Sequence, residues 1–279
     1  MTTPTPGFVT IDENNAIHVL HARPREGMAT FVFLNSMGAT TAAWEADIGP
    51  ALRELGFGTL SFDYRGQGET RFGPDAVLEP AEIIADIVRV FRTELPIRPI
   101  MVGLSIGGLF GAQALRQGAE ARGIAFINTL RKPNAQVEWI NTLEARLIAM
   151  GGMPLVLDVL RPVLSGRDQL ALLRPTHLSD EGYTPWPADN PRRRLADGVH
   201  KADWDYPWAE LSVPALVLTG LYDRLFRIQE DVDELVGQIP DATVVTYPDG
   251  GHSLHSEHPA RFVDDLSSFA SAIALKEAV

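Results

Sequence analysis

Short apolar segments alternate with amphipathic segments along most of this chain, and this alternation constrains the fold more than any other feature. The segments of strand length lie at 29–35, 57–66, 99–104, 123–128, 213–220 and 242–248. The segments with helical periodicity lie at 42–56, 79–95, 106–118, 228–239 and 259–278. Strands that alternate with helices predict a mostly parallel sheet covered by helices on both faces. Two short segments before them, 8–11 and 16–22, predict a hairpin.

The alternation breaks between about Leu130 and Asp203, where no convincing strand is found. Two helical patterns, at 134–151 and 154–166, occur there, together with Pro-rich and charged loops such as 182–198. We therefore expect one α/β domain formed by residues 1–129 and 204–279, with residues 130–203 inserted as a helical cap.

Composition excludes several classes of function. The formal net charge of −12 argues against nucleic-acid binding, which needs clustered Lys and Arg, and against anionic membrane surfaces. The chain has no cysteine, so disulfides, thiolate zinc sites and a cysteine nucleophile are excluded. No secretory signal is visible, and no apolar run approaches the roughly 18 residues that span a bilayer. We expect a soluble, cytoplasmic protein.

A glycine-rich turn at 103–107, Gly-Leu-Ser-Ile-Gly, places Ser105 between a predicted strand and a predicted helix. This context is the one that a G-x-S-x-G nucleophile motif requires. A serine at so sharp a turn has a strained backbone, and the flanking glycines avoid collisions that side chains would cause. The motif predicts a nucleophilic hydroxyl at the carboxyl edge of the sheet.

A serine hydroxyl needs a base and an orienting acid. Among the seven histidines, His252 lies in a Gly-rich loop after a predicted strand, and so emerges at the same sheet edge as Ser105. Asp223 follows another predicted strand and precedes His252 by 29 residues, since 252 − 223 = 29. The order Ser105, Asp223, His252 is that of α/β-hydrolases. Asp63 also ends a strand, but we interpret it as a structural turn residue.

An oxyanion hole completes such a site. One donor is expected to be the backbone N–H of Ile106, directly after the serine, and the other the N–H of Met37 in the loop after the first buried strand. Asn35 and Ser36 could hold that loop by side-chain hydrogen bonds.

The chain resembles the α/β-hydrolase family across nearly its whole length. DYRGQGET at 63–70 resembles the family's D-x-R-G-x-G-x-S segment, with Gln67 and Thr70 as variants. LNSMGATTAAWE at 34–45 resembles the oxyanion loop of 3-oxoadipate enol-lactonases, and the stretches 103–115 and 127–141 are similar to their nucleophile region and cap entrance. The resemblance implies an α/β-hydrolase fold with the insertion as its cap.

The resemblance also implies a substrate that carries a carboxylate, because the family's cap usually presents basic and aromatic groups to one. Arg131, Lys132 and Trp139 occupy the corresponding stretch and are the candidate substrate-binding residues. The run Arg192-Arg193-Arg194 could attract an anionic substrate or form a solvated charged turn.

We therefore expect a cofactor-independent serine hydrolase, without a metal, that cleaves a small ester or lactone. Two alternatives stay open. One is a carbon–carbon bond hydrolase of a diketone or dienoate, since the same triad serves that chemistry on this fold. The other is a ligand-binding receptor with a vestigial triad. The expected partner is a small-molecule substrate, and the sequence does not decide the oligomeric state.

Overall fold

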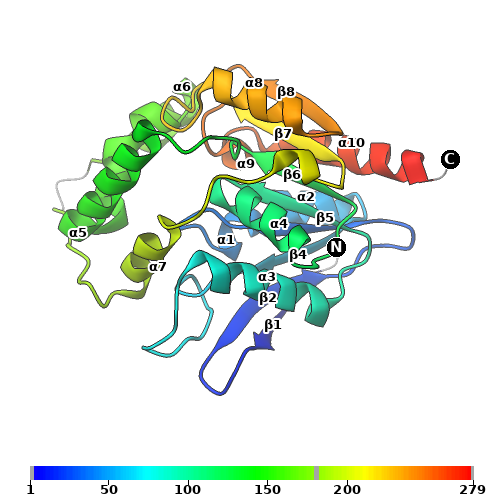
Figure 1. The fold of residues 1–279 in the computed structure, drawn as a ribbon, viewed down its shortest axis with the longest axis horizontal. Helices are drawn as coiled ribbons and strands as arrows, with labels where there is room; N and C mark the ends of the chain where they lie inside the picture. The colour runs from blue at the N-terminus through cyan, green and yellow to red at the C-terminus, as the bar shows by residue number, and fades with distance from the viewer. Residues whose placement is uncertain (1–2, 179–181, 278–279) are drawn as a thin grey trace.

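The computed structural model describes residues 3–178 and 182–277, in which eight strands form one sheet in the order β1-β2-β4-β3-β5-β6-β7-β8 (Figure 1). The strands are β1 Thr5–Thr10, β2 Ala16–Ala22, β3 Thr30–Leu34, β4 Gly58–Phe62, β5 Pro99–Leu104, β6 Gly123–Ile127, β7 Ala215–Gly220 and β8 Ala242–Tyr247. β2 runs antiparallel to both β1 and β4, whereas β4 and β3 and the strands that follow in the sheet pair in parallel. The expected mostly parallel α/β architecture is confirmed.

The strands in the middle of the sheet are apolar along their whole length because both faces are covered. Every residue of β3, β4, β6 and β7 is buried, as is usual for a parallel sheet between two helical layers. The carboxyl ends of the parallel strands meet at one edge, and the loops that leave this edge carry the predicted site residues.

Helices cover the two faces of the sheet and enclose two separate apolar cores. One face carries α3 Pro80–Glu94, α4 Ile106–Arg116 and α8 Gln229–Gln238. The other carries α1 Thr41–Glu45, α2 Ile48–Glu54 and α10 Pro259–Glu277, and the short α9 Leu254–Glu257 precedes α10. The expectation of a single helix at 42–56 was wrong. Asp47 leaves the helical region with φ −136° and separates α1 from α2.

Helices without strands fill the described part of the insertion between β6 and β7, and they lie beside the sheet rather than on its faces (Figure 1). They are α5 Ala135–Leu164, α6 Arg167–Leu173 and α7 Pro191–Val199, with short 3₁₀ turns at Arg174–Thr176 and, just before β7, Trp208–Glu210. The two helices expected at 134–151 and 154–166 are both present within α5, and Gly152, with φ 66° and ψ −169°, interrupts the helical backbone between them.

The expectation of a loop at 182–198 was wrong for its second half, which is the helix α7. Asn190 caps this helix by accepting hydrogen bonds from the backbone N–H groups of Arg192 and Arg193, and Pro191 occupies the first turn. An asparagine followed by proline is a recognised helix start, so the signal was present in the sequence.

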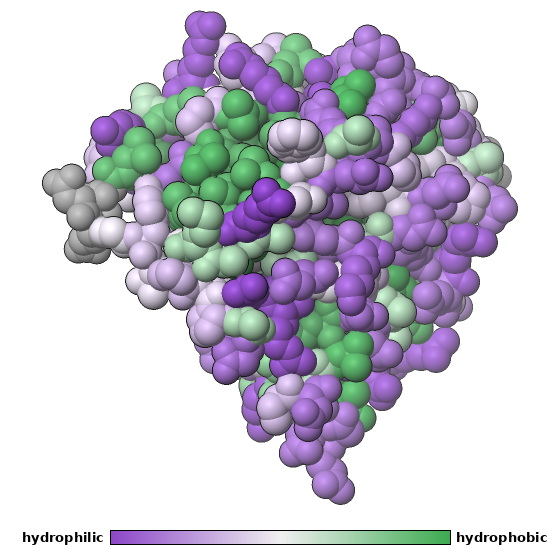
Figure 2. Space-filling view, turned by 60° about the vertical axis from the view of Figure 1, so that its left-hand side comes forward, coloured by the Kyte–Doolittle hydropathy of each residue, from purple (hydrophilic) through white to green (hydrophobic). Residues whose placement is uncertain are grey.

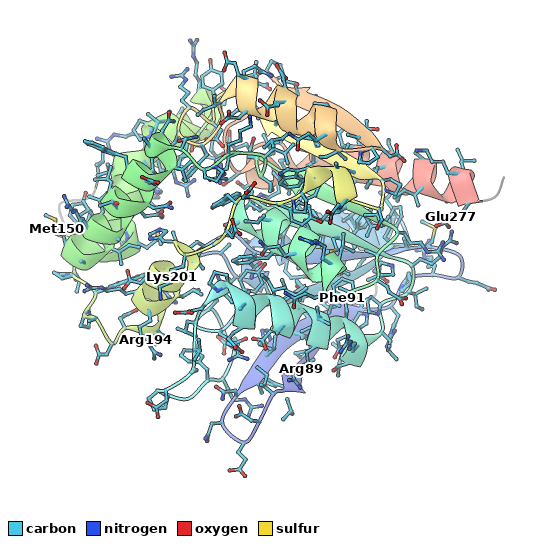
Figure 3. All side chains as sticks on the ribbon, viewed as in Figure 1. Arg89, Phe91, Met150, Arg194, Lys201 and Glu277 are labelled. Atoms are coloured by element: carbon cyan, nitrogen blue, oxygen red, sulfur yellow. The ribbon has the colours of Figure 1, made fainter. Side chains whose placement is uncertain are left out.

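The arginine run at the start of α7 ties the cap to the core. Arg194 donates through Nη1 to the carbonyl of Pro74 and through Nη2 to that of Ala76, both at 2.6 Å. Arg193 donates to the carbonyl of Trp186 at 2.8 Å. Figure 3 marks Arg194 beside α7, on the side of the loop that contains residues 74–76. Two of the three guanidinium groups are therefore engaged in backbone contacts.

By length and composition alone, α5 could cross a membrane, since one 18-residue window has a mean hydropathy of 1.6. The sequence expectation concerned uninterrupted apolar runs, and residues 135–164 are interrupted by Glu144, Arg146, Asp158 and Arg161. The helix bends at Gly152, and its residues Ile148, Val156 and Leu160 form a small apolar core with Ala196 of α7. We therefore describe α5 as the main helix of the cap.

Candidate active site

Ser105 lies at the turn between β5 and α4 with φ 55° and ψ −120°, a strained conformation for a residue other than glycine. The flanking glycines are required by close packing. A Cβ on Gly103 would lie 2.3 Å from the Cα of Gly108, and one on Gly107 would lie 2.4 Å from the carbonyl oxygen of Leu34. The turn presents the serine side chain to a cavity between core and cap.

Asp223 and His252 meet beside this turn, each on a loop that follows a strand of the parallel sheet. Asp223 Oδ2 lies 2.6 Å from His252 Nδ1, and Asp223 is 1% exposed. Burial opposes ionisation of this carboxyl, whereas the charge and hydrogen bond of His252 favour it. With the N–H of Phe226 and the charge of Arg131 added, the pKa of Asp223 is lowered below its ordinary value.

Asn128, directly after β6, fixes the loop that carries His252. Its Nδ2 donates to the carbonyls of Gly251 and His252, both at 2.9 Å, and its Oδ1 accepts from the N–H of Gly220 at 2.9 Å. The N–H of His252 donates to the carbonyl of Leu164 at 2.6 Å. The histidine is therefore held from both the core and the cap.

The side chain of Ser105 is hydrogen-bonded to Arg131, not to His252. Arg131 Nη2 donates to Ser105 Oγ at 2.8 Å, and Oγ has no other partner among residues 3–178 and 182–277. Ser105, Arg131 and His252 all line the same cavity. Hydrogen bonds of a catalytic base are often long or unformed before substrate binds, so this geometry is compatible with a later Ser105–His252 contact.

Arg131 is a buried cation, with 4% of its surface exposed. Its guanidinium lies 4.4 Å from the ring centre of Trp204 and 4.3 Å from that of Phe226, and Nη2 also donates to the carbonyl of Asn128 at 3.0 Å. Burial lowers the pKa of Arg131 to about 10, although the charges of Asp223 and Glu144 oppose that change. The side chain therefore stays cationic at neutral pH.

The two residues expected to supply the oxyanion-hole N–H groups lie at the cavity that Ser105 lines. Met37 and Ile106 both line it, and within the described residues neither N–H donates a hydrogen bond. Ile106 is the first residue of α4, where a helix leaves its N–H groups without a backbone partner. These are the two donors that the sequence predicts for the oxyanion hole.

Asn35 holds the loop of Met37, as expected. Asn35 Nδ2 donates to the carbonyl of Phe62 at 2.9 Å, and Asn35 Oδ1 accepts from Trp44 Nε1 at 2.8 Å. Among the described residues, the side chain of Ser36 has no hydrogen-bond partner and so does not share that task. Its backbone carbonyl accepts from Gln67 Nε2 at 3.0 Å.

The cavity has a volume of about 490 Å³ and lies between the cap and the carboxyl edge of the sheet. The core contributes the loop of residues 36–39, the turn at Ser105 and the loop of His252. The cap contributes one face of α5, together with residues of α6, α7 and the segment after it. The cap residues on that wall include Glu144, Met153, Val156, Leu157, Leu160, Arg161, Gln169, Val199 and His200.

Two of the residues expected to bind substrate lie outside this cavity. Lys132 forms an ion pair with Glu234 of α8 instead. Trp139 is 75% exposed. Other exposed apolar side chains of the cap are Met150, Val159 and Leu172, and Figure 2 shows hydrophobic residues gathered on the side of the molecule that carries the cap. Figure 3 shows Met150 at the outer edge of α5, away from the core.

The structure brings to the cavity residues that no sequence motif indicated: Glu144, Arg161 and His200 of the cap, Trp204, Phe226, and His255 after His252. Glu144 Oε2 lies 3.4 Å from His200 Nε2. His255 is buried against Trp44, with 4.7 Å between the ring centres. No local motif distinguishes these side chains from ordinary core or surface residues. Within the described residues, no cluster of three or more metal-ligating side chains is found.

Comparison with known proteins gives a family match over most of the chain. The model of the Alpha/beta hydrolase family matches residues 31–265. A relative from Variovorax paradoxus that carries the name carbamate hydrolase RutD is 26% identical, over 90% of this chain and 94% of its own. A pimeloyl-[acyl-carrier protein] methyl ester esterase from Pectobacterium atrosepticum is 26% identical, over 88% of this chain and 96% of its own.

Solved structures agree on the fold. The enol-lactonase from Burkholderia xenovorans superposes with a TM-score of 0.75 at 24% identity, covering 95% of this chain and all of its own. An esterase from Exiguobacterium antarcticum superposes with a TM-score of 0.76 at 16% identity, covering 97% of this chain and all of its own. At these identities the likeness concerns the fold.

Proposed function

The chain belongs to the α/β-hydrolase family, and on that premise we propose that it is a cofactor-independent serine hydrolase of a small carboxylic ester or lactone. The observation that carries this proposal is the buried Asp223–His252 pair, which opens onto the same cavity as the strained Ser105. The names of the relatives support hydrolysis of a carbonyl compound without naming this chain's substrate.

In the proposed reaction, Ser105 Oγ attacks the substrate carbonyl while His252 Nε2 takes its proton. Asp223 holds the imidazole through Nδ1 and stabilises the imidazolium that forms. The N–H groups of Ile106 and Met37 donate to the tetrahedral oxyanion. His252 then protonates the leaving oxygen, and afterwards activates the water that releases the acyl group from Ser105.

Arg131 has a role at the nucleophile in this scheme. Its hydrogen bond to Ser105 Oγ leaves the hydroxyl proton free to be donated to His252. The guanidinium charge stabilises negative charge on Oγ, both when the proton leaves and when Oγ departs from the acyl-enzyme. Because Trp204 and Phe226 hold the guanidinium in place, it is oriented before the reaction begins.

The proposed organisation keeps residues 130–203 as the cap and residues 1–129 and 204–279 as the hydrolase core. Arg131 stays a candidate active-site residue, but Lys132 and Trp139 are not carried further as substrate-binding residues, because neither lines the cavity. A cytoplasmic location stays a prediction.

A serine-directed phosphonate tests the proposal directly. We expect it to add its mass at Ser105 and to abolish turnover of short-chain p-nitrophenyl esters. Ser105→Ala should lower kcat by about 10⁴-fold or more and prevent labelling. Ser36→Ala is the matched control, because Ser36 lines the same cavity. This variant should keep the wild-type kcat and should still be labelled at Ser105.

The same substrate panel separates the alternatives. Turnover of a ring-cleavage dienoate, with no turnover of esters or lactones, would identify a carbon–carbon bond hydrolase. Tight ligand binding without turnover of any substrate would identify a receptor. A folded Ser105→Ala protein that keeps a tenth of the wild-type kcat would refute the assignment of the nucleophile.

A further inference from the structure

The cap wall of the cavity is apolar over most of α5, but it contains one buried carboxylate. The side chains of α5 on this wall include Met153, Val156, Leu157 and Leu160, together with Glu144. Glu144 is 9% exposed, so its charge is removed from most of the surrounding water. A buried carboxylate is costly to the folded protein unless it is paired and hydrogen-bonded. Its partners therefore show whether the protein satisfies this group by itself.

The free protein satisfies Glu144 only in part. Its Oε2 lies 3.4 Å from Nε2 of His200, just after α7, a long contact compared with the usual distance of about 3 Å. Among the described residues this is the one hydrogen bond of the carboxylate, which has about four acceptor sites. The other oxygen, Oε1, is not sealed from solvent, so it is accessible from the cavity that Glu144 lines. A ligand in the cavity can therefore reach an unused acceptor.

Neighbouring side chains supply hydrogen-bond donors. Asn141 lies one turn before Glu144 on α5 and lines the same cavity. Residues three positions apart share one face of a helix, so the amide of Asn141 lies beside the carboxylate of Glu144. Asn141 and His200 also line an outer groove between α5 and α7. These three polar side chains therefore form the part of the cavity wall that is nearest to the outer groove.

Charge decides which group of a ligand suits this part of the wall. The charge of Glu144 acts on the guanidinium of Arg131 and helps to keep it protonated. A substrate ammonium would be repelled by Arg131, and a substrate carboxylate would be repelled by Glu144. A neutral hydroxyl meets neither obstacle, because it can donate one hydrogen bond to a carboxylate and accept another from an amide.

We propose that Glu144, with Asn141 and His200 beside it, binds a hydroxyl group of the substrate, so that the preferred ester or lactone is hydroxylated and uncharged. This inference rests on the proposed hydrolase function, and it differs from the acidic substrate that the family resemblance implies. A substrate that fills the cavity excludes water from Glu144 and must replace the hydrogen bonds of that water. An analogue without the hydroxyl leaves a buried carboxylate unsatisfied, and sites of this kind discriminate against such analogues.

The test compares methyl esters that differ at the far end of the acyl chain. Methyl ω-hydroxyhexanoate ends in a hydroxyl, methyl heptanoate has a methyl group at the same place, and monomethyl adipate has a carboxylate. A second pair varies the alcohol part, with hydroxyethyl butanoate against propyl butanoate. A pH-stat records the hydrolysis of each ester. We expect wild type to prefer the hydroxylated member of at least one pair, by kcat/KM, and to cleave monomethyl adipate less well than methyl ω-hydroxyhexanoate.

Glu144→Leu should reduce the hydroxyl preference, which is the ratio of kcat/KM for the hydroxylated ester to that for its methyl counterpart. The expected reduction is about 10- to 100-fold, as for one hydrogen bond to a charged group. Glu144→Gln keeps the shape and a neutral acceptor, so it should reduce the ratio less. Glu138→Leu is the matched control, because it removes an exposed carboxylate from the same helix. This control should leave the ratio unchanged.

Four results would overturn the proposal. The first is that wild type prefers neither hydroxylated ester, or prefers monomethyl adipate to methyl ω-hydroxyhexanoate. The second is that Glu144→Leu keeps the wild-type ratio. The third is that Glu138→Leu reduces the ratio as much as Glu144→Leu does, which would show a general effect of charge. The fourth is that both Glu144 variants lower the Tm and lower kcat/KM equally for hydroxylated and methyl esters. Glu144 and His200 would then only join α5 to α7.

Equilibrium binding separates this proposal from the proposed function. Calorimetry with both pairs of esters on the Ser105→Ala protein requires no turnover. We expect the hydroxylated member of at least one pair to bind more tightly, and the additional Glu144→Leu change to remove that preference. If wild type cleaves no ester but this preference is found, only the hydrolase function fails. If wild type cleaves methyl heptanoate and the preference is absent, only the hydroxyl site fails.

Discussion

Replacing Arg131 by methionine should slow the chemistry at Ser105 with every substrate, not only with acidic ones. Methionine keeps an unbranched side chain between Trp204 and Phe226 but removes the charge and the hydrogen bond to Oγ. The structure therefore leads to a different expectation from the sequence, where Arg131 was a candidate for binding a substrate carboxylate. The difference arises because its Nη2 lies 2.8 Å from the nucleophilic oxygen itself.

The magnitude follows from the burial of that contact. With 4% exposure, the guanidinium is shielded from water, so its hydrogen bond to Oγ is of the charge-assisted kind. Such a bond contributes about 1.5–3 kcal/mol. At about 1.4 kcal/mol per factor of ten, kcat/KM for a neutral ester should fall about 10- to 100-fold. Arg131→Lys should give an intermediate value, because an ammonium keeps the charge but not the planar fork that reaches both Ser105 and Asn128.

The assay is stopped-flow hydrolysis of p-nitrophenyl acetate, in which the burst of p-nitrophenol reports acylation of Ser105. The rate of phosphonate labelling at Ser105 provides a second measure that does not depend on deacylation. The Tm of each variant shows whether the fold has been retained. Trp139→Met, at an exposed position of the cap, serves as a control for handling and folding.

Two outcomes would refute this reasoning. If Arg131→Met acylates at the wild-type rate, the contact with Oγ does not assist the reaction. If the loss is confined to esters that carry a carboxylate, Arg131 binds substrate as the sequence suggested, and its contact with Ser105 exists only in the free protein.

Two further predictions concern carboxylates and histidines near the site. Asp223→Asn should lower kcat by about 10⁴-fold with little change in substrate binding, because the wrong imidazole tautomer is favoured. Asp63→Asn should mainly lower the Tm, since Asp63 accepts from the N–H of Thr41 at 2.8 Å and lies 3.0 Å from His18 Nδ1. If Asp63→Asn lowered kcat and Asp223→Asn lowered only the Tm, the choice of Asp223 as the acid would be wrong. Burial lowers the pKa of His255 from 6.5 to about 4. Between these pH values the unfolded chain binds a proton at this histidine and the folded protein does not. The contribution of His255 to stability is therefore full above about pH 6.5 and is lost as the pH falls toward 4. Between pH 7 and pH 4, the free energy of unfolding of His255→Leu should therefore fall by about 3 kcal/mol less than that of wild type. Urea denaturation at each pH measures this difference. If the two proteins lose stability in parallel as the pH falls, His255 does not titrate in this way.

Local patterns were sufficient wherever local physics decides the structure. Period-two and continuous apolar runs, the helical periodicity of 79–95, and the glycines around Ser105 led to elements that the structure contains at nearly the same bounds. The two main errors were also local. Asp47 divides the helix expected at 42–56, and Asn190 followed by Pro191 begins a helix where a loop was expected.

Topology explains why candidate residues far apart in the sequence could be chosen together. Parallel strands place all of their carboxyl ends at one edge of the sheet, so loops that follow different strands converge there. The order of Ser105, Asp223 and His252 could be read from the chain for this reason, and the structure brings Asp223 and His252 into contact. Their catalytic roles stay predictions until the variants are measured.

The sequence by itself therefore determined the class of fold, the family resemblance and the residues that converge at the sheet edge. Only the tertiary structure decided which cap residues face the cavity. It turned Arg131 onto Ser105, paired Lys132 with Glu234 and exposed Trp139 to solvent. The physical reason is that α5 is apolar on several sides, so its pattern does not show which stripe packs inward. That orientation is set by how the cap docks on loops that are distant in the sequence. One such contact is the hydrogen bond from the N–H of His252 to the carbonyl of Leu164.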